Sequence, residues 1–178
     1  MKLFHWLVIA ALGLLSACVS VRSSTAPGTD LMHYRTFAWA QPTDPSVARM
    51  ERSPAGQTVR NEIVRNLNAR GIEEAQQGRA PDFLVAYHVV LRDRLDVTDW
   101  GWGWWGTWGG ADVYQYTQGT IIVDFIDPRT NAVFWRGSAS RDVDTPENPD
   151  LGDVASAVDK LMKTYPVRVA SAGARPSG

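Results

Sequence analysis

Asp124 is the carboxylate of this chain whose surroundings are most able to alter its chemistry. It stands inside the apolar run 121–126, and burial shifts the ionisation of a carboxylate toward values that catalysis can use. The expected hairpin register, however, brings Arg136 of the next strand close to Asp124. An ion pair with Arg136 is therefore the stronger interpretation, and general acid or base catalysis is the weaker one.

The other groups that could do chemistry are scattered along the chain. His33 and His88 are far apart, and a single cysteine leaves no spacing that suits a zinc site. An acidic segment could take a hard cation such as calcium, but its spacing is not that of an EF-hand and favours a solvated turn, so we expect no bound metal. The acidic residues of this segment are Asp142, Asp144, Glu147 and Asp150.

Motifs that bind nucleotides or activate a serine are missing or degenerate. Residues 101–106 formally match G-x-G-x-x-G, but a dinucleotide site needs small neighbours and a helix directly after the motif. Here bulky tryptophans fill the variable places and two more glycines follow at 109–110. Neither a P-loop nor a G-x-S-x-G motif is present. We therefore expect no cofactor and no enzymatic activity, and an envelope hydrolase is only a third possibility.

Cys18 is the most informative reactive residue. The apolar run over residues 3–15 is too short for the roughly 20 residues of a membrane-spanning helix and has the proportions of a signal peptide. It ends in Leu15-Ser16-Ala17-Cys18, which resembles the lipobox of bacterial lipoproteins. The resemblance implies that residues 1–17 are removed and that Cys18, the only cysteine, carries a diacylglycerol. An ordinary secretory signal with an incidental cysteine is the alternative.

The residues after Cys18 indicate where the anchor is sorted. Val19 and Ser20 contain no aspartate, a pattern that resembles lipoproteins exported to the outer membrane. We therefore expect an outer-membrane anchor and a domain that faces the periplasm. Residues 18–30 are rich in Ser, Thr, Gly and Pro and predict a flexible tether, and residues 167–178 predict a disordered tail.

Charge and length limit what the domain between these segments can do. The chain has 18 Lys and Arg against 19 Asp and Glu, a net charge of −1. This balance argues against electrostatic binding of nucleic acid, which needs a basic face. The lone cysteine excludes an internal disulfide. Residues 31–166 are long enough for one domain with a hydrophobic core.

The hydrophobic pattern of residues 31–166 predicts an α+β fold. Ser53-Pro54 begins a helix that stops at Gly71, and Asp150 caps a second helix that Pro166 ends. The order β-α-β-β-β-α predicts a two-layer sandwich, in which one mostly antiparallel sheet carries both helices on a single face. Runs rich in aromatic and β-branched residues predict strands over 34–39, 83–91, 120–126 and 132–140, the last two joined by a turn over 127–131.

Several of these motifs, in this order, resemble the bacterial lipoproteins grouped as DUF4136. The resemblance covers nearly all of the chain after Cys18 and implies fold and location, because the family offers no catalytic residues to carry over. The motifs are a lipobox, a Gly/Trp-rich stretch, and the segments 34–39, 81–83, 119–120, 127–128, 133–137, 157–158 and 165–166.

A Trp/Gly-rich loop over residues 99–116 is the one segment whose composition a core does not explain. Glycine at every second or third place defeats a helix, so a loop between strands that packs on itself is one interpretation. The indole ring is apolar with a polar N–H, which suits membrane interfaces, sugar faces and protein hot spots. The candidate binding surface consists of Trp100, Trp102, Trp104, Trp105 and Trp108.

Together these observations predict a lipid-anchored binding or scaffolding module of the cell envelope. Its expected partners are the membrane, through the anchor, and an envelope protein or peptidoglycan. Binding of a small ligand or glycan in a groove between the sheet and the Trp-rich loop is the alternative.

Overall fold

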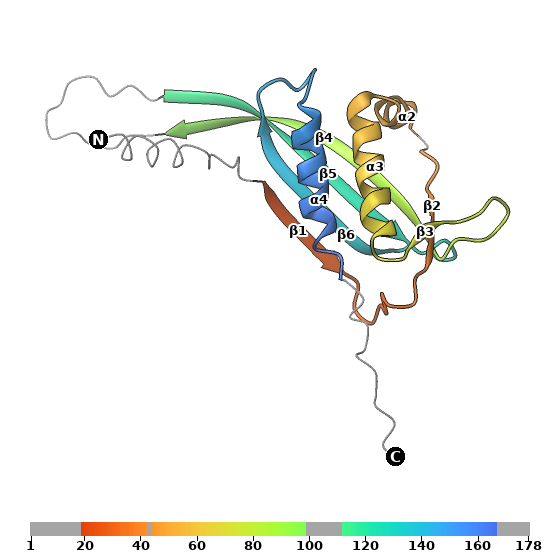
Figure 1. The fold of residues 1–178 in the computed structure, drawn as a ribbon. Helices are drawn as coiled ribbons and strands as arrows, with labels where there is room; N and C mark the ends of the chain where they lie inside the picture. The colour runs from red at the N-terminus through yellow and green to blue at the C-terminus, as the bar shows by residue number, and fades with distance from the viewer. Residues whose placement is uncertain (1–18, 43, 99–111, 167–178) are drawn as a thin grey trace, which may run out of the picture.

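A computed structural model describes residues 19–42, 44–98 and 112–166, with the backbone alone for 94–98 and 112–116. These residues form a six-stranded sheet in the order β1-β6-β5-β4-β2-β3 and three helices (Figure 1). The strands are β1 Ser20–Thr25, β2 Thr36–Trp39, β3 Glu73–Glu74, β4 Phe83–Thr98, β5 Asp112–Ile126 and β6 Val133–Val143. The helices are α2 Pro45–Glu51, α3 Pro54–Asn68 and α4 Leu151–Met162.

The expected α+β class is confirmed, and α3 and α4 lie side by side on one face of the sheet (Figure 1). Strand polarity matches the expectation only in part. β4, β5, β6 and β1 pair antiparallel, but β2 pairs parallel with both β4 and β3. The reason is the connection: a chain that crosses over through a helix such as α3 returns in the same direction.

Part of the expected flexible tether, residues 18–30, is a strand. Ser20–Thr25 form β1, which pairs antiparallel with β6 along its whole length. The polar side chains of this segment gave no strand signal because backbone groups make the pairing, and an edge strand can leave its Ser and Thr side chains in water. In residues 19–30, the side chains that pack against the core are Val19, Val21 and Ala26.

Local sequence sets the helix starts where we expected them. The Ser53 side chain accepts a hydrogen bond from the Gly56 amide at the start of α3, and Asp150 does the same for Asp153 at the start of α4. These caps satisfy amides that have no partner inside the helix. Gly71 follows α3 with a φ of 70°, a conformation that favours glycine. The short α2, capped by Asp44, was not expected.

The core lies between the helix face of the sheet and the helices α3 and α4. A bulge in β6 sets Phe125 opposite Trp135 and Ile126 opposite Val133, so the intervening Phe134 is buried beside Trp135. Close approach of α4 depends on Gly137, where a Cβ would lie 2.6 Å from a methyl of Leu161. The fully buried large side chains are Phe37, Val59, Ile63, Leu67, Phe83, Val85, Tyr87, Phe125, Trp135, Leu161, Met162 and Tyr165.

Tyr87 and Tyr165 are both buried in this core, but their hydroxyl groups differ in hydrogen bonding. The Tyr87 hydroxyl donates to the Gly56 carbonyl oxygen at 2.9 Å, whereas the Tyr165 hydroxyl has no hydrogen-bond partner among the described residues. Burial raises the pKa of each phenol to about 12. Because the folded pKa exceeds the unfolded value of 10.0, each phenol contributes stability that is complete below pH 10 and is lost as the pH rises toward 12.

We expect Tyr87→Phe and Tyr165→Phe to affect stability differently. Tyr87→Phe removes the buried hydrogen bond that the Tyr87 hydroxyl donates to the Gly56 carbonyl, and it should lower the free energy of unfolding by about 1 kcal/mol at pH 8. Tyr165→Phe removes an unbonded polar atom and should leave that value unchanged or raise it. Between pH 9 and pH 11.5, either variant should lose less stability than the parent chain in urea titrations. Equal destabilisation by the two variants at pH 8 would show that the Tyr165 hydroxyl does have a partner.

Candidate functional site

The sheet continues beyond its helix layer at one end. β5 pairs with β6 only as far as Thr117 opposite Val143, while β4 and β5 remain paired out to Thr98 opposite Asp112. Beyond β6 these two strands therefore form a two-stranded ribbon that projects from the domain (Figure 1). At its base the Thr117 hydroxyl donates to the Asp93 carboxylate of the facing strand at 2.9 Å.

The residues that the sequence proposed for binding and lipidation lie outside the described residues. They are Cys18 and the five tryptophans Trp100, Trp102, Trp104, Trp105 and Trp108. The expected loop 99–116 is shortened by the structure, since residues 112–116 belong to β5.

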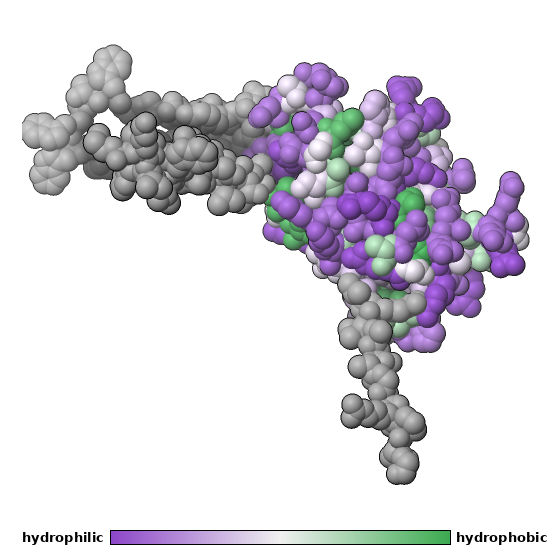
Figure 2. Space-filling view, viewed as in Figure 1, coloured by the Kyte–Doolittle hydropathy of each residue, from purple (hydrophilic) through white to green (hydrophobic). Residues whose placement is uncertain are grey.

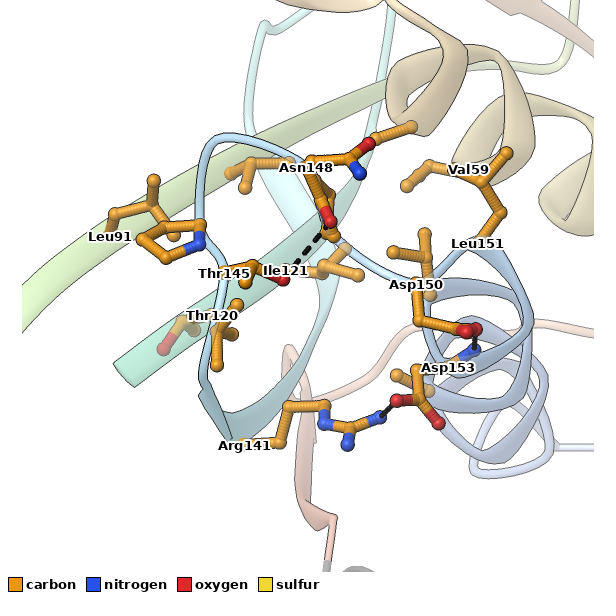
Figure 3. Close-up of a pocket in the computed structure, with 18 of the residues that line it drawn as sticks. Val59, Leu91, Thr120, Ile121, Arg141, Thr145, Asn148, Asp150, Leu151 and Asp153 are labelled. Carbon is orange, nitrogen blue, oxygen red and sulfur yellow. Dashed lines mark hydrogen bonds and ion pairs between the residues drawn. The ribbon is translucent and has the colours of Figure 1, made fainter. Parts of the chain in front are cut away.

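A hollow of ≈ 530 Å³ opens where the helix layer ends and the sheet continues (Figure 3). The sheet forms its floor, the N-terminal ends of α3 and α4 form one wall, and the segment 143–150 closes around it. Figure 2 shows this side of the molecule as largely hydrophilic, with a few separate hydrophobic patches. The apolar lining residues include Met50, Val59, Val89, Leu91, Ile121, Val143, Leu151 and Val154.

Exposed apolar side chains gather in this hollow. Val89, Leu91 and Leu151 are 37%, 50% and 43% exposed. They are three of the five large hydrophobic side chains that the described residues expose, and all three line the hollow. Such a concentration marks an interaction surface more often than scattered exposed residues do. The sequence showed the alternation of Val89 and Leu91 but not that the helix layer ends before them.

Polar side chains at the rim come from the end of β6, from α4 and from the segment between them. The Arg141 guanidinium pairs with the Asp153 carboxylate at 2.7 Å, and Asp150 caps α4. The acidic residues Asp142, Asp144, Glu147 and Asp150 all line the hollow. Within the described part of the chain, no three His, Cys, Asp or Glu side chains are grouped so that they could hold a metal ion.

Asp124 lies away from the hollow, on the sheet face that carries no helix. The expected pair with Arg136 is confirmed: the guanidinium binds both carboxylate oxygens, at 2.6 and 2.7 Å. The carboxylate is 5% exposed and the arginine side chain 56%. The hydrogen bonds that Arg136 donates to the Asp124 carboxylate raise the pKa of Arg136. Both acceptor atoms of Asp124 are therefore occupied by a structural ion pair.

His33 and His88 lie in different parts of the structure. His33 follows β1 and its Nδ1 lies 2.7 Å from the Asp30 carboxylate, an exposed contact. His88 is exposed on the helix-free face of β4. The structure thus places neither histidine in the hollow.

The chain belongs to the family described as "Domain of unknown function (DUF4136)", whose model matches residues 21–167. No curated protein matches it. A PDZ domain protein from Parabacteroides distasonis is similar in fold, with 13% identity and a TM-score of 0.55, over 89% of this chain and 39% of that one.

Two further solved structures are similar at lower TM-scores. A PelC dodecamer from Paraburkholderia phytofirmans has 15% identity and a TM-score of 0.47, over 85% of this chain and 100% of that one. A DUF4136 family protein from Bacteroides thetaiotaomicron has 13% identity and a TM-score of 0.48, over 82% and 94%. At such identities the likeness concerns the fold.

Among the helices that the structure describes, none is both long enough and apolar enough to cross a membrane.

Replacing Arg136 should lower the free energy of unfolding more than replacing most exposed arginines would. We expect Arg136→Gln to lower the free energy of unfolding by on the order of 2 to 4 kcal/mol, because it leaves a buried carboxylate without its cation. The matched control, Arg129→Gln, breaks an exposed 3.8 Å contact with Asp127 and should cost less than about 1 kcal/mol. Urea titration at pH 7 measures both. A double variant, Asp124→Leu with Arg136→Leu, should recover much of the loss; equal costs for the two single variants would contradict the assignment.

Proposed function

We propose that this protein is a lipid-anchored envelope protein of the outer membrane whose domain faces the periplasm and works as a binding or scaffolding module. Cys18 carries the anchor, and the tryptophans between β4 and β5 form the working surface. The proposal assigns the chain no catalytic role. The bidentate ion pair that occupies Asp124 supports this part of it.

The observation that carries the proposal is the direction in which the strands run. Ser20 pairs with Ser140, Ser140 with Thr120, and Thr120 with Val90, so these four residues form one row across the sheet. Since β1 is antiparallel to β6, and β5 to both β6 and β4, β1 begins at the end of the sheet toward which β4 runs. The chain therefore enters β1 from the end that carries the ribbon.

This arrangement supports a Trp-rich segment that works close to the membrane. Cys18 precedes Ser20 by two residues, so an anchor on Cys18 would hold the ribbon end of the domain at the bilayer. From the row of Ser20, β4 continues for eight residues, Val90 to Thr98, through the end of the sheet and along the ribbon, which is about 27 Å at 3.4 Å per residue. Tryptophan favours the membrane interface. The geometry therefore favours a contact with the membrane interface, or with a protein held there, over one with glycan farther away.

Lipidation can be tested by itself. We expect the chain to incorporate radiolabelled palmitate in a bacterium that processes lipoproteins, and Cys18→Ser to abolish the label because no other thiol is present. Ser24→Ala, on the exposed edge strand, is the control and should label as the parent chain does. Label retained in Cys18→Ser would contradict the anchor.

The working surface can be tested by photo-cross-linking in cells. A photoreactive amino acid at Trp104 should give discrete adducts with envelope protein or lipid. The same probe at Lys160, on the exposed side of α4, should give none. Adducts at Trp104 should disappear from the Cys18→Ser variant, which no longer holds the surface at its membrane.

Other outcomes would change the proposal. Cross-links to peptidoglycan at Trp104 would replace it with glycan binding. Absence of cross-links at both positions, in a chain that is labelled with palmitate, would remove the tryptophans as a working surface while leaving the anchor in place.

A further inference from the structure

We propose that the hollow between the sheet, α3 and α4 binds a basic amphipathic helix of a protein partner. This surface is separate from the Trp-rich segment and rests only on described residues. Three properties support it: an uncovered apolar floor, an excess of carboxylates at the rim, and a position that continues the helix layer.

The apolar floor exists because the sheet is longer than the helices that cover it. Tyr87 of β4 lies under α3, where it bonds Gly56, and is 1% exposed. Val89 and Leu91 follow on the same face of the strand, and their exposure rises to 37% and 50%. Leu151, the first residue of α4, faces the hollow from the opposite wall (Figure 3). An incoming apolar surface would remove all three side chains from water, which is the main favourable term in association.

The charged residues that line the hollow favour a basic partner. The hollow is lined by five carboxylates and by one cation, Arg141. Asp153 is paired with Arg141 and Asp150 caps α4. The remaining three have no ion pair within the described residues, and neither Arg49 of α2 nor Arg52, which follows α2, lines the hollow. They are Asp142, Asp144 and Glu147, and all three are exposed. An excess of negative charge around an apolar floor repels anionic headgroups and attracts lysine and arginine side chains.

The shape favours a helix laid on the surface over an enclosed small molecule. Half of the Leu91 side chain remains open to solvent, so the floor is a face and not the bottom of a closed cavity. The hollow lies directly beyond the N-terminal ends of α3 and α4, where a third helix would extend the same layer over the sheet. Amphipathic helices bind in such grooves through apolar residues spaced three and four apart, with charged residues at the edge.

A synthetic peptide tests the proposal with the full chain. The probe is a fluorescein-labelled 14-residue peptide of leucine and lysine at helical spacing, and its partner peptide has glutamate in place of lysine. Fluorescence anisotropy should show saturable binding of the lysine peptide that weakens with added salt, and no binding of the glutamate peptide. Leu91→Ser should weaken binding at least fivefold, and so should the triple variant Asp142→Asn, Asp144→Asn, Glu147→Gln.

Matched control variants distinguish binding in the hollow from nonspecific hydrophobic or electrostatic binding elsewhere on the protein. Val133→Ser removes a similarly exposed hydrophobic residue at the other end of β6, and Glu73→Gln with Glu74→Gln removes exposed charge from β3. Both should bind the lysine peptide as the parent chain does. A variant with Trp102, Trp104 and Trp105 changed to serine should also bind normally, so failure here is distinguishable from failure of the proposed function.

Three results would overturn the proposal. The first is equal binding of the lysine and glutamate peptides, and the second is an equal loss of peptide affinity in the hollow variants and the control variants. The third is self-association of the chain that Leu91→Ser abolishes, because a second copy of the chain would then be the occupant. Thermal unfolding midpoints within a degree or two of the parent confirm that each variant is folded.

Discussion

The antiparallel pairing of β4 with β5 is the constraint on which the rest of this structure depends. It runs without interruption from Leu84 opposite Ile126 to Thr98 opposite Asp112. One half of this ladder lies in the middle of the sheet and presents Val85, Tyr87 and Phe125 to the helices. The other half leaves the domain as a ribbon. A single pair of strands thus supplies both the floor of the core and the extension that carries the tryptophan segment.

Burial on only one face of the sheet explains how the polar residues are arranged. On the helix face, side chains are apolar as far as the helices extend, and a series of aromatic contacts runs from Phe83 through Phe125 and Trp135 to Tyr165. On the helix-free face, a carboxylate can be tolerated because Arg136 covers it. Asp124 therefore sits in an apolar stretch of sequence without being a site: its neighbours Val123 and Phe125 point into the core, and it points away from it.

The two ends of the sheet differ in how they are closed. At one end, the β5–β6 turn is closed by hydrogen bonds between Asp127 and residues 131–132. At the other end, β1 begins, the ribbon leaves and the helix layer stops short of the sheet. The start of β1, the outer end of the β4–β5 ribbon and the acidic hollow thereby lie toward one end of the domain. A binding module held at a membrane would benefit from this polarity, because its partners are restricted to the same plane.

The sequence by itself determined the α+β class, both long helices, the β5–β6 hairpin and the ion pair between Asp124 and Arg136. Each of these follows from local rules: capping residues, turn residues, hydrophobic period and cross-strand register. Tertiary structure alone decided that Ser20–Thr25 form a strand, because backbone pairing with β6 holds an edge that its polar side chains do not predict. It also decided the parallel pairing of β2 with β4, which depends on the path of α3. The hollow could not be foreseen for the same kind of reason: Val89 and Leu91 have the pattern of core residues, and only the place where α3 and α4 begin leaves them uncovered.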